Sequence, residues 1–187
     1  MATTQAPAQA GTGRTTWNVD PTHTNVEFAV RHMMISTVKG RFADVKGTVD
    51  ADEADPTRSS VRVEIGAASI DTRAEQRDAH LRSADFLDAE RYATITFVSK
   101  RIERVGQRLR LIGDVTIRGV TRELALTVEL EGRGRDPWGN ERAGFHAAGT
   151  LDRKDFGLTW NQALETGGIL VGDEVKISVD AELVKQS

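Results

Sequence analysis

The sequence has no cysteine, no long apolar run and no surplus of basic residues. Without cysteine there is no disulfide framework and no thiolate chemistry, and the redox compartment of the protein is left open. The apolar runs are far too short for a helix that spans a bilayer, so we expect no transmembrane segment. The formal net charge of −3 argues against nucleic acid as a partner, because non-specific binding to phosphates needs clustered positive charge.

Known motifs of catalysis and cofactor binding are also absent. The chain has no G-x-S-x-G, P-loop or dinucleotide-binding fingerprint, and its carboxylates fall on faces predicted to be wet. Its histidines, which are His23, His32, His80 and His146, contain no pair at the spacing of a zinc motif. We therefore expect no cofactor, no bound metal ion and no identifiable pair of nucleophile and base.

The length of 187 residues favours a single domain with a short tail. A chain of this size can bury a sizeable core without disulfides or metal ions. Residues 1–16 are rich in Ala, Thr, Gln and Gly, with Arg14 as the one basic residue. This composition predicts a flexible tail and no secretory signal, so we expect a folded domain over residues 17–187 and a cytoplasmic location.

The rest of the chain carries the pattern of an all-β protein. In the segment 60–69, valine and isoleucine alternate with charged residues, and the segments 121–133 and 173–184 show the same period of two. One apolar face and one wet face are typical of antiparallel strands that pack on a single core. The pattern predicts eight strands, over residues 23–34, 37–50, 60–69, 93–103, 107–118, 121–133, 141–152 and 173–184.

Short turns join several of these strands. Gly106 and Gly119 fall in two tight hairpins, and the segment 136–140 (DPWGN) combines a proline that fixes φ with residues that accept positive φ. The second strand changes parity between Phe42 and Val45. This change predicts a β-bulge at the two residues between them, which is the usual way to bend a long strand round a barrel.

One helix is predicted between the third and fourth strands, over residues 72–82. Thr72 and Glu75 have the spacing of a capping box, and Ala74 and Leu81 contribute to an apolar stripe. The chain has no internal repeat and no regular alternation of strands and helices, which argues against a parallel α/β fold.

Eight antiparallel strands with one apolar face each favour closure into a β-barrel, because closure removes the exposed edges that promote aggregation. A barrel of eight strands is wide enough to hold either packed side chains or one small ligand. The small residues on the apolar faces fit both a hollow interior and a tapered, packed one. They are Gly113, Ala143, Ala147 and Gly149.

The first predicted strand carries a histidine in line with its apolar face. Val26, Phe28, Val30, His32 and Met34 share this face, and residues 25, 27, 29 and 31 share the other. His32 is therefore either a hydrogen-bonded core histidine or a ligand contact, whereas the parity of His146 predicts exposure to solvent. The apolar residues expected to line the interior are Val26, Phe28, Val30, Phe42, Ile65, Phe97, Leu111, Leu126 and Val179.

Several segments resemble, in order, elements of the YceI-like family. The segment 77–86 is similar to the family's R-D-x-H-L-x-x-x-D-F element, and 92–97 is similar to its Y-P-x-I-x-F element, with alanine in place of the usual proline. The segment 115–121 resembles the L-T-I-R-G-V-T hairpin, with valine in place of the leucine. With the opening strand and the segments 153–158 and 171–175, the resemblance covers about residues 17–184.

Members of this family form lipocalin-like barrels that bind polyisoprenoid lipids, and many of them are exported. The resemblance therefore implies an all-β, eight-stranded antiparallel lipocalin-like β-barrel. It also implies that the protein carries or stores an isoprenoid or other long-chain lipid without catalysis. From the residues themselves, we expect the lipid head group at one mouth, near His32, Arg77 and His80, because an arginine fork matches a phosphate.

Two other functional classes stay open at this point. The first is a barrel enzyme that uses His32 with a carboxylate as acid or base on a small hydrophobic substrate. The second is a packed structural or stress protein with no ligand. His80, with Arg77 and Asp78, either orients a phosphate or carboxylate, or ties a capped helix to the end of the barrel. The pattern leaves open which lipid is bound and whether the chain forms a homodimer.

Overall fold

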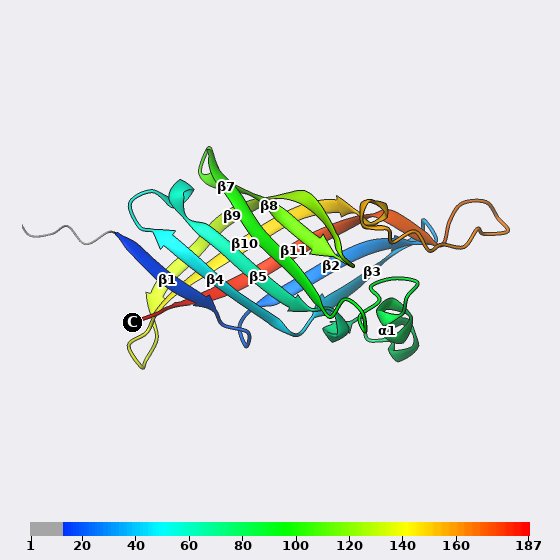
Figure 1. Ribbon diagram of the computed structural model, residues 1–187, viewed down its shortest axis with the longest axis horizontal. Coiled ribbons are helices and arrows are strands. Elements are labelled where there is room, and N and C mark those ends of the chain that lie inside the picture. The colour runs from blue at the N-terminus through cyan, green and yellow to red at the C-terminus, as the bar shows by residue number, and fades with distance from the viewer. Residues whose placement is uncertain (1–12) are drawn as a thin grey trace, which may run out of the picture.

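Antiparallel strands dominate residues 13–187, the part of the chain that this computed structural model describes (Figure 1). The helix α1 spans Glu75–Arg82, and short 3₁₀ turns span Pro56–Arg58, Ala67–Ser69 and Arg153–Phe156. The strands are β1 Arg14–Val19, β2 Asn25–His32, β3 Ser36–Phe42, β4 Val45–Asp52, β5 Ser60–Gly66, β6 Ile70–Asp71, β7 Thr94–Val105, β8 Arg108–Ile117, β9 Val120–Arg135, β10 Glu141–Asp152 and β11 Val171–Lys185.

Each of the first three strand positions of the barrel is filled by two short strands placed end to end. β1 and β2 lie along β11, with Trp17 opposite Lys185 and Val26 opposite Val179. In the next position round the barrel, β4 pairs with β1 and β3 pairs with β2. In the third, β5 pairs with β4 and β6 pairs with β3. Each such pair counts as one interrupted strand, so eight antiparallel strands follow one another round the barrel and β11 closes it. This confirms the predicted eight-stranded barrel with α1 between the third and fourth strands.

At the position of the predicted bulge the strand is interrupted, because β3 ends at Phe42 and β4 begins at Val45. The hairpin turns are also where the glycines predict them. Gly106, Gly119 and Gly139 all have positive φ. Arg118 shares this conformation with φ of 51°, so the turn between β8 and β9 has two adjacent residues of positive φ, as a tight hairpin of this hand requires.

The start of the barrel differs from the prediction, because Arg14 and the two threonines after it belong to β1 and not to a tail. The physical reason is Trp17, whose side chain is buried with Ala143 and Leu183. Burial of this indole holds β1 between β4, which pairs with residues 14–18, and β11, which pairs with residues 17–19. The predicted flexibility of residues 1–12 lies outside the described residues.

The predicted first strand also runs too far at its other end. Met34, expected on the inward face, lies in the turn between β2 and β3, where its φ is 59° and its side chain is exposed. A period of two in the sequence does not distinguish the end of a strand from a turn made of apolar residues.

The helix α1 begins later than predicted and has no capping box. Its N-cap is Ala74, which makes no side-chain cap bond. Thr72 is buried instead, and both its backbone N–H and its hydroxyl donate to Oδ1 of Asp78, at 2.9 and 2.5 Å. The polar partner of Thr72 is therefore a carboxylate one turn inside the helix. No helix among residues 13–187 has the length and apolar character that crossing a bilayer demands.

A hydrogen-bond network around Arg142 stabilises the end of the barrel opposite α1 (Figure 1). Its Nη1 donates to Asp20 at 2.8 Å and to Glu182 at 2.6 Å, and its Nε donates to Asp136 at 2.8 Å. The turn after β1, the β9–β10 turn and β11 are thereby joined. Hydrogen bonds from Thr22 and then Arg142 hold the pKa of the Asp20 carboxyl well below its usual range, and the bond from Arg142 does the same to the pKa of Asp136.

Two of the small residues on the inward faces make room for large neighbours. A Cβ at Gly113 would lie 2.5 Å from Cζ of Phe97 and 2.5 Å from the carbonyl oxygen of Val98. A Cβ at Gly149 would lie 2.8 Å from Cδ2 of Leu126. These glycines therefore let side chains of the neighbouring strands lie flat on the wall.

We predict that Gly113→Ala destabilises the protein by about 1–3 kcal/mol, because the added methyl group meets a backbone carbonyl that cannot move aside cheaply. Gly132→Ala is the matched control, since its Cβ would have no neighbour within 4 Å and its φ is not positive. Urea unfolding of the two variants measures the difference. Equal stability of the two would show that β7 and β8 do not approach as closely as described.

The Arg142 network predicts a defined dependence on pH. A carboxyl group whose pKa is lowered on folding stabilises the folded state above its ordinary pKa of about 4, and this stabilisation is lost as the pH falls through the folded value. Arg142→Gln should therefore lower the melting temperature most at neutral pH, and the gap to the wild type should narrow progressively below about pH 4. Melting curves over a pH series test this, and a gap that is independent of pH would contradict it.

Candidate functional site

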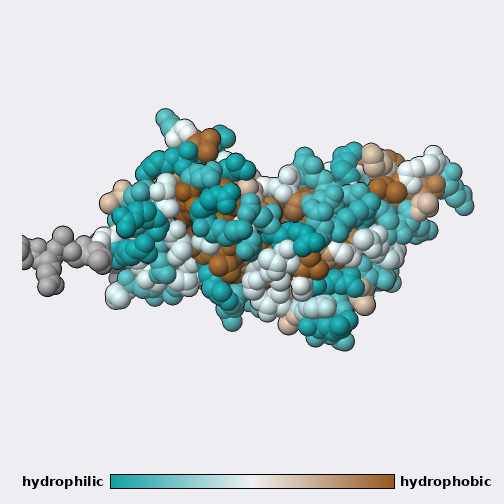
Figure 2. All heavy atoms as spheres, turned by 45° about the horizontal axis from the view of Figure 1, so that its top comes forward, coloured by the Kyte–Doolittle hydropathy of each residue, from teal (hydrophilic) through white to brown (hydrophobic). Residues whose placement is uncertain are grey.

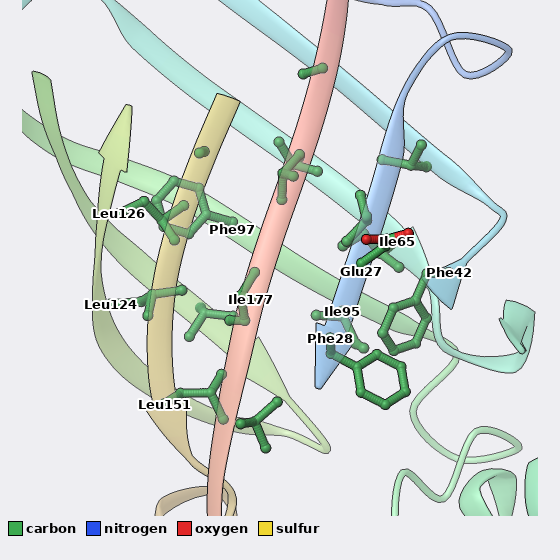
Figure 3. Close-up of a pocket in the computed structure, with 18 of the residues that line it drawn as sticks. Glu27, Phe28, Phe42, Ile65, Ile95, Phe97, Leu124, Leu126, Leu151 and Ile177 are labelled. Atoms are coloured by element: carbon green, nitrogen blue, oxygen red, sulfur yellow. The ribbon is translucent and has the colours of Figure 1, made fainter. Parts of the chain in front are cut away.

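The barrel encloses a cavity of about 990 Å³ whose walls are mainly aliphatic and aromatic side chains. Figure 3 shows Phe28, Phe42, Ile65 and Ile95 on one side of it and Phe97, Leu124, Leu126 and Leu151 on the other. Because strands alternate their side chains between two faces, each strand delivers every second residue to this space. The interior is hollow, so a packed barrel, which the sequence left open, is wrong.

All twelve residues proposed for the site border the cavity. They are Val26, Phe28, Val30, His32, Phe42, Ile65, Arg77, His80, Phe97, Leu111, Leu126 and Val179. Cross-strand pairing brings several together, as Val26 lies opposite both Phe42 and Val179. The rings of Phe28 and Phe42 are 5.6 Å apart. That these residues contact a ligand stays a prediction.

Two charged residues of β2, Glu27 and Arg31, border the cavity although parity assigns them to the outside, and both are exposed to solvent. The carboxylate of Glu27 accepts a hydrogen bond of 2.7 Å from Asn25. Their charges are therefore hydrated and do not sit in the apolar interior.

Arg77 reaches the end of the cavity from α1. Its Nε donates to Oγ1 of Thr72 at 2.7 Å, and its Nη2 donates to the carbonyl oxygen of the same residue at 2.9 Å. Part of the fork predicted to bind a phosphate is thus already satisfied by protein. The Nη1 group donates to no acceptor among residues 13–187, and the residue is exposed to solvent.

His80 forms the centre of an aromatic cluster at the same end. Its Nε2 lies 2.8 Å from Oδ2 of Asp85, and its ring is edge-on to Phe86 and Trp160, at 5.1 and 4.6 Å between centroids. Trp160 and Phe86 also border the cavity. Sequence reasoning missed Trp160, because it lies between the 3₁₀ turn Arg153–Phe156 and β11, in a segment without periodicity.

His32 ends β2 opposite Val171 and is partly buried at the edge of the cavity. Its imidazole makes no hydrogen bond to any residue in the described part of the chain. The structure therefore gives His32 no carboxylate partner, which the enzyme alternative requires. His80 has such a partner in Asp85, but the side chains of that pair are partly open to solvent.

Arg153 is a buried cation at this end that sequence reasoning also missed. Its Nε donates to the carbonyl oxygen of Gly172 at 2.8 Å, and its Nη1 donates to those of Leu158 and Trp160 at 2.6 and 2.9 Å. Burial lowers the pKa of the Arg153 guanidinium. These bonds hold the segment 158–172 in place beside the mouth, so this arginine positions Trp160.

The opposite end of the cavity is bordered by charged side chains. Arg104, Arg108 and Arg133 lie there, and Arg133 is paired with Glu53 at 3.0 Å. These residues had no place in the sequence-based site, because they stand at the ends of strands beside turns. The cavity thus has an apolar middle and a polar group of residues at each end.

Two groups of histidine and carboxylates could hold a metal ion by their geometry. Asp20, His23 and Glu182 form one, and Glu131, His146 and Asp180 form the other. In the first group Nη1 of Arg142 already binds Asp20 and Glu182. In the second, Nδ1 of His146 lies 2.8 Å from Asp180, and this bond raises the pKa of the histidine. Neither histidine borders the cavity, as parity predicts for His146.

Comparison with known proteins places these features in a family. The model of the YceI-like domain matches residues 17–183. A UPF0312 protein of Staphylococcus epidermidis is 40% identical over 169 residues, which is 90% of this chain and 96% of the relative.

Solved structures share the fold. Burkholderia cenocepacia BcnA superimposes with a TM-score of 0.77 at 24% identity, over 88% of this chain and 98% of its own. A polyisoprenoid binding domain from Saccharophagus degradans, implicated in plant cell wall breakdown, gives a TM-score of 0.65 at 13% identity, over 91% and 98% of the two chains.

We predict that Phe97→Asp destabilises the protein by about 3 kcal/mol or more, because it buries an unpaired charge. Val98→Asp is the control on the next residue, since Phe97 is 8% exposed and Val98 is 40% exposed on the outer face. Thermal unfolding should show a change of less than about 1 kcal/mol for the control. A Phe97→Asp variant as stable as Val98→Asp would overturn the assignment of the inner face.

Proposed function

This chain belongs to the YceI-like family, and we propose that its barrel binds an isoprenoid or similar long-chain lipid and carries or stores it without catalysis. The observation that supports this proposal most directly is the hollow apolar cavity of about 990 Å³. A related fold is that of a polyisoprenoid binding domain. Cavities of this size, with mostly apolar walls and a few polar groups, are typical sites for small molecules.

The energy of burial supports a long apolar ligand. Each buried CH₂ group contributes about 0.8 kcal/mol, so a chain of about twenty carbons offers roughly 16 kcal/mol. Association and ordering cost about 4–15 kcal/mol. If this cost is about 8 kcal/mol or less, the remainder of at least about 8 kcal/mol corresponds to micromolar binding or tighter.

The polar ends of the cavity give the ligand a direction. We propose that the head group lies at the α1 end, where His32, the free Nη1 of Arg77 and His80 face the mouth. The neighbouring Trp160 and Phe86 provide flat surfaces for the first part of the lipid chain. The cytoplasmic location stays a prediction, and whether the chain forms a homodimer stays open.

The absence of catalysis is part of the proposal. Among residues 13–187, the described contacts give His32 no partner that would orient it as an acid or base. Screens of the wild type for hydrolase and isomerase activity on hydrophobic esters and isoprenoids should therefore find no more activity than the His32→Ala variant shows. Turnover that depends on His32 would establish the enzyme alternative instead.

We predict that delipidated protein takes up a polyprenyl phosphate or a polyprenol, detected by native mass spectrometry and by extraction into organic solvent. His32→Ala should weaken binding about two- to tenfold, which is what the loss of one hydrogen bond costs. His146→Ala, on the outer wall, should leave affinity unchanged. Equal effects of the two variants would contradict the head-group site, and a wild type that takes up no isoprenoid would contradict carriage.

A further inference from the structure

The α1 end of the barrel carries an exposed apolar tip, defined as Met33, Met34 and Ile35 in the turn between β2 and β3. Their exposed fractions are 37%, 64% and 76%. In Figure 1 this turn lies at the same end as the long loop before β11, and Figure 2 shows hydrophobic residues, in brown, at this end of the molecule. Turns of this kind are usually built from Gly, Asn, Asp and Ser.

The backbone of the tip is strained for the residues it contains. Met33 and Met34 have φ of 54° and 59°, and the N–H of Ile35 donates to the carbonyl oxygen of His32 at 3.0 Å. A β-turn whose two central residues both have positive φ favours Asn-Gly, and methionine adopts this conformation at a cost. The turn is therefore not optimised for stability or for solubility, which points to a role for its side chains.

The tip is also held in a fixed position beside the cavity. The N–H of Met33 donates to the carbonyl oxygen of Leu170 at 2.8 Å, and Nη2 of Arg31 donates to that of Met34 at 3.0 Å. His32 and Leu170, which adjoin the tip, both border the cavity. A surface bound by the tip would thus lie against the mouth at which we place the head group.

Within the β2–β3 hairpin itself the charge has one sign. Between Glu27 and Asp44 the chain has three basic residues, Arg31, Lys39 and Arg41, and no carboxylate. Arg31 and Lys39 lie on the exposed outer face of the hairpin, and neither forms an ion pair within residues 13–187.

Of the acidic residues in the adjoining segment, Asp173 is paired with Lys154 at 3.0 Å, and Glu165 lies in the loop whose Gly168 adjoins Met34. Exposed apolar side chains beside cations that have no carboxylate partner match a bilayer surface, because the apolar groups enter below the head groups and the cations meet anionic lipid.

We propose that the tip docks the mouth of the barrel onto the surface of a membrane that contains anionic lipid. The apolar side chains would enter the interface, and Arg31 and Lys39 would contact lipid phosphates. This goes beyond lipid carriage, because docking does not depend on what fills the cavity. Vesicle binding and lipid uptake can therefore fail separately.

The test is sedimentation of the full chain with vesicles of phosphatidylcholine and phosphatidylglycerol, compared with vesicles of phosphatidylcholine alone. We expect binding to the mixed vesicles that weakens as salt is raised. Met34→Ser with Ile35→Ser should reduce binding at least about tenfold, since two apolar side chains no longer enter the interface. Arg31→Gln and Lys39→Gln should each reduce it about fivefold.

The chain offers matched controls. Trp138→Ser removes an apolar residue that is 81% exposed in the β9–β10 turn, at the other end of the barrel, and should bind like the wild type. Lys46→Gln removes a positive charge from β4, outside the tip, and should also bind like the wild type. Because the chain lacks cysteine, Ser36→Cys and Trp138→Cys each take a single environment-sensitive dye, and only the dye at position 36 should shift to the blue with mixed vesicles.

Three results would overturn the proposal. One is equal binding by the wild type and the Met34→Ser, Ile35→Ser variant, with melting temperatures that show both to be folded. Another is loss of binding in Trp138→Ser but not at the tip. The third is a wild type that ignores vesicles and forms a dimer in sedimentation velocity that the tip variant lacks, which would assign the tip to a second copy of the chain.

Discussion

The pairing of β11 with both β1 and β2 is the constraint on which the rest of the molecule depends. On its other edge β11 pairs with β10 along eleven positions, from Arg142 to Asp152 of the neighbouring strand. With both edges used, the sheet has nowhere to end and must curve until it closes. Closure assigns one face of every strand to the interior, and the alternation in the sequence then decides which side chains meet there.

The interior that closure creates is not filled by those side chains. Phe97 lies over Gly113, and Leu126 lies over Gly149, so part of the large apolar volume is spread along the wall. Charged groups gather at the two ends, where Arg77 and His80 border one mouth and Arg133 with Glu53 borders the other, and Glu27 on the wall between them is exposed to solvent. This distribution separates a dry middle, which solvates a hydrocarbon chain, from ends that remain in contact with water.

Most of the fold and much of the cavity wall could be predicted from the sequence, because both follow from a period of two. Val26, Phe97 and Val179 were placed inside by parity alone, and parity also placed His146 outside. Where the period is absent, prediction failed. Trp160 and Arg153 belong to a segment held by hydrogen bonds from one guanidinium to distant carbonyl groups, and no local pattern encodes such bonds.

Other failures came from residues whose role depends on a partner far along the chain. β1 is too short to be recognised from its own sequence, and it is ordered because Trp17 packs against Ala143 and Leu183. Thr72 looks like a helix cap in sequence, but in three dimensions its hydroxyl is used by Asp78 and Arg77. Hydrogen-bonding side chains have several local options, and the tertiary structure selects among them.

The interruptions in the first three strand positions of the barrel have a mechanical consequence. The break between β1 and β2 lies beside the break between β3 and β4, and that break lies beside the short 3₁₀ turn between β5 and β6, as the bond from the N–H of Ala43 to the carbonyl oxygen of Ser69 shows. Together they form a crease across three neighbouring strands, where fewer main-chain bonds cross the wall. The unbroken strands β7 to β11 make the opposite side stiff. The wall is therefore held by fewer main-chain hydrogen bonds along this line than on the side of β7 to β11, so local opening of the barrel costs least there.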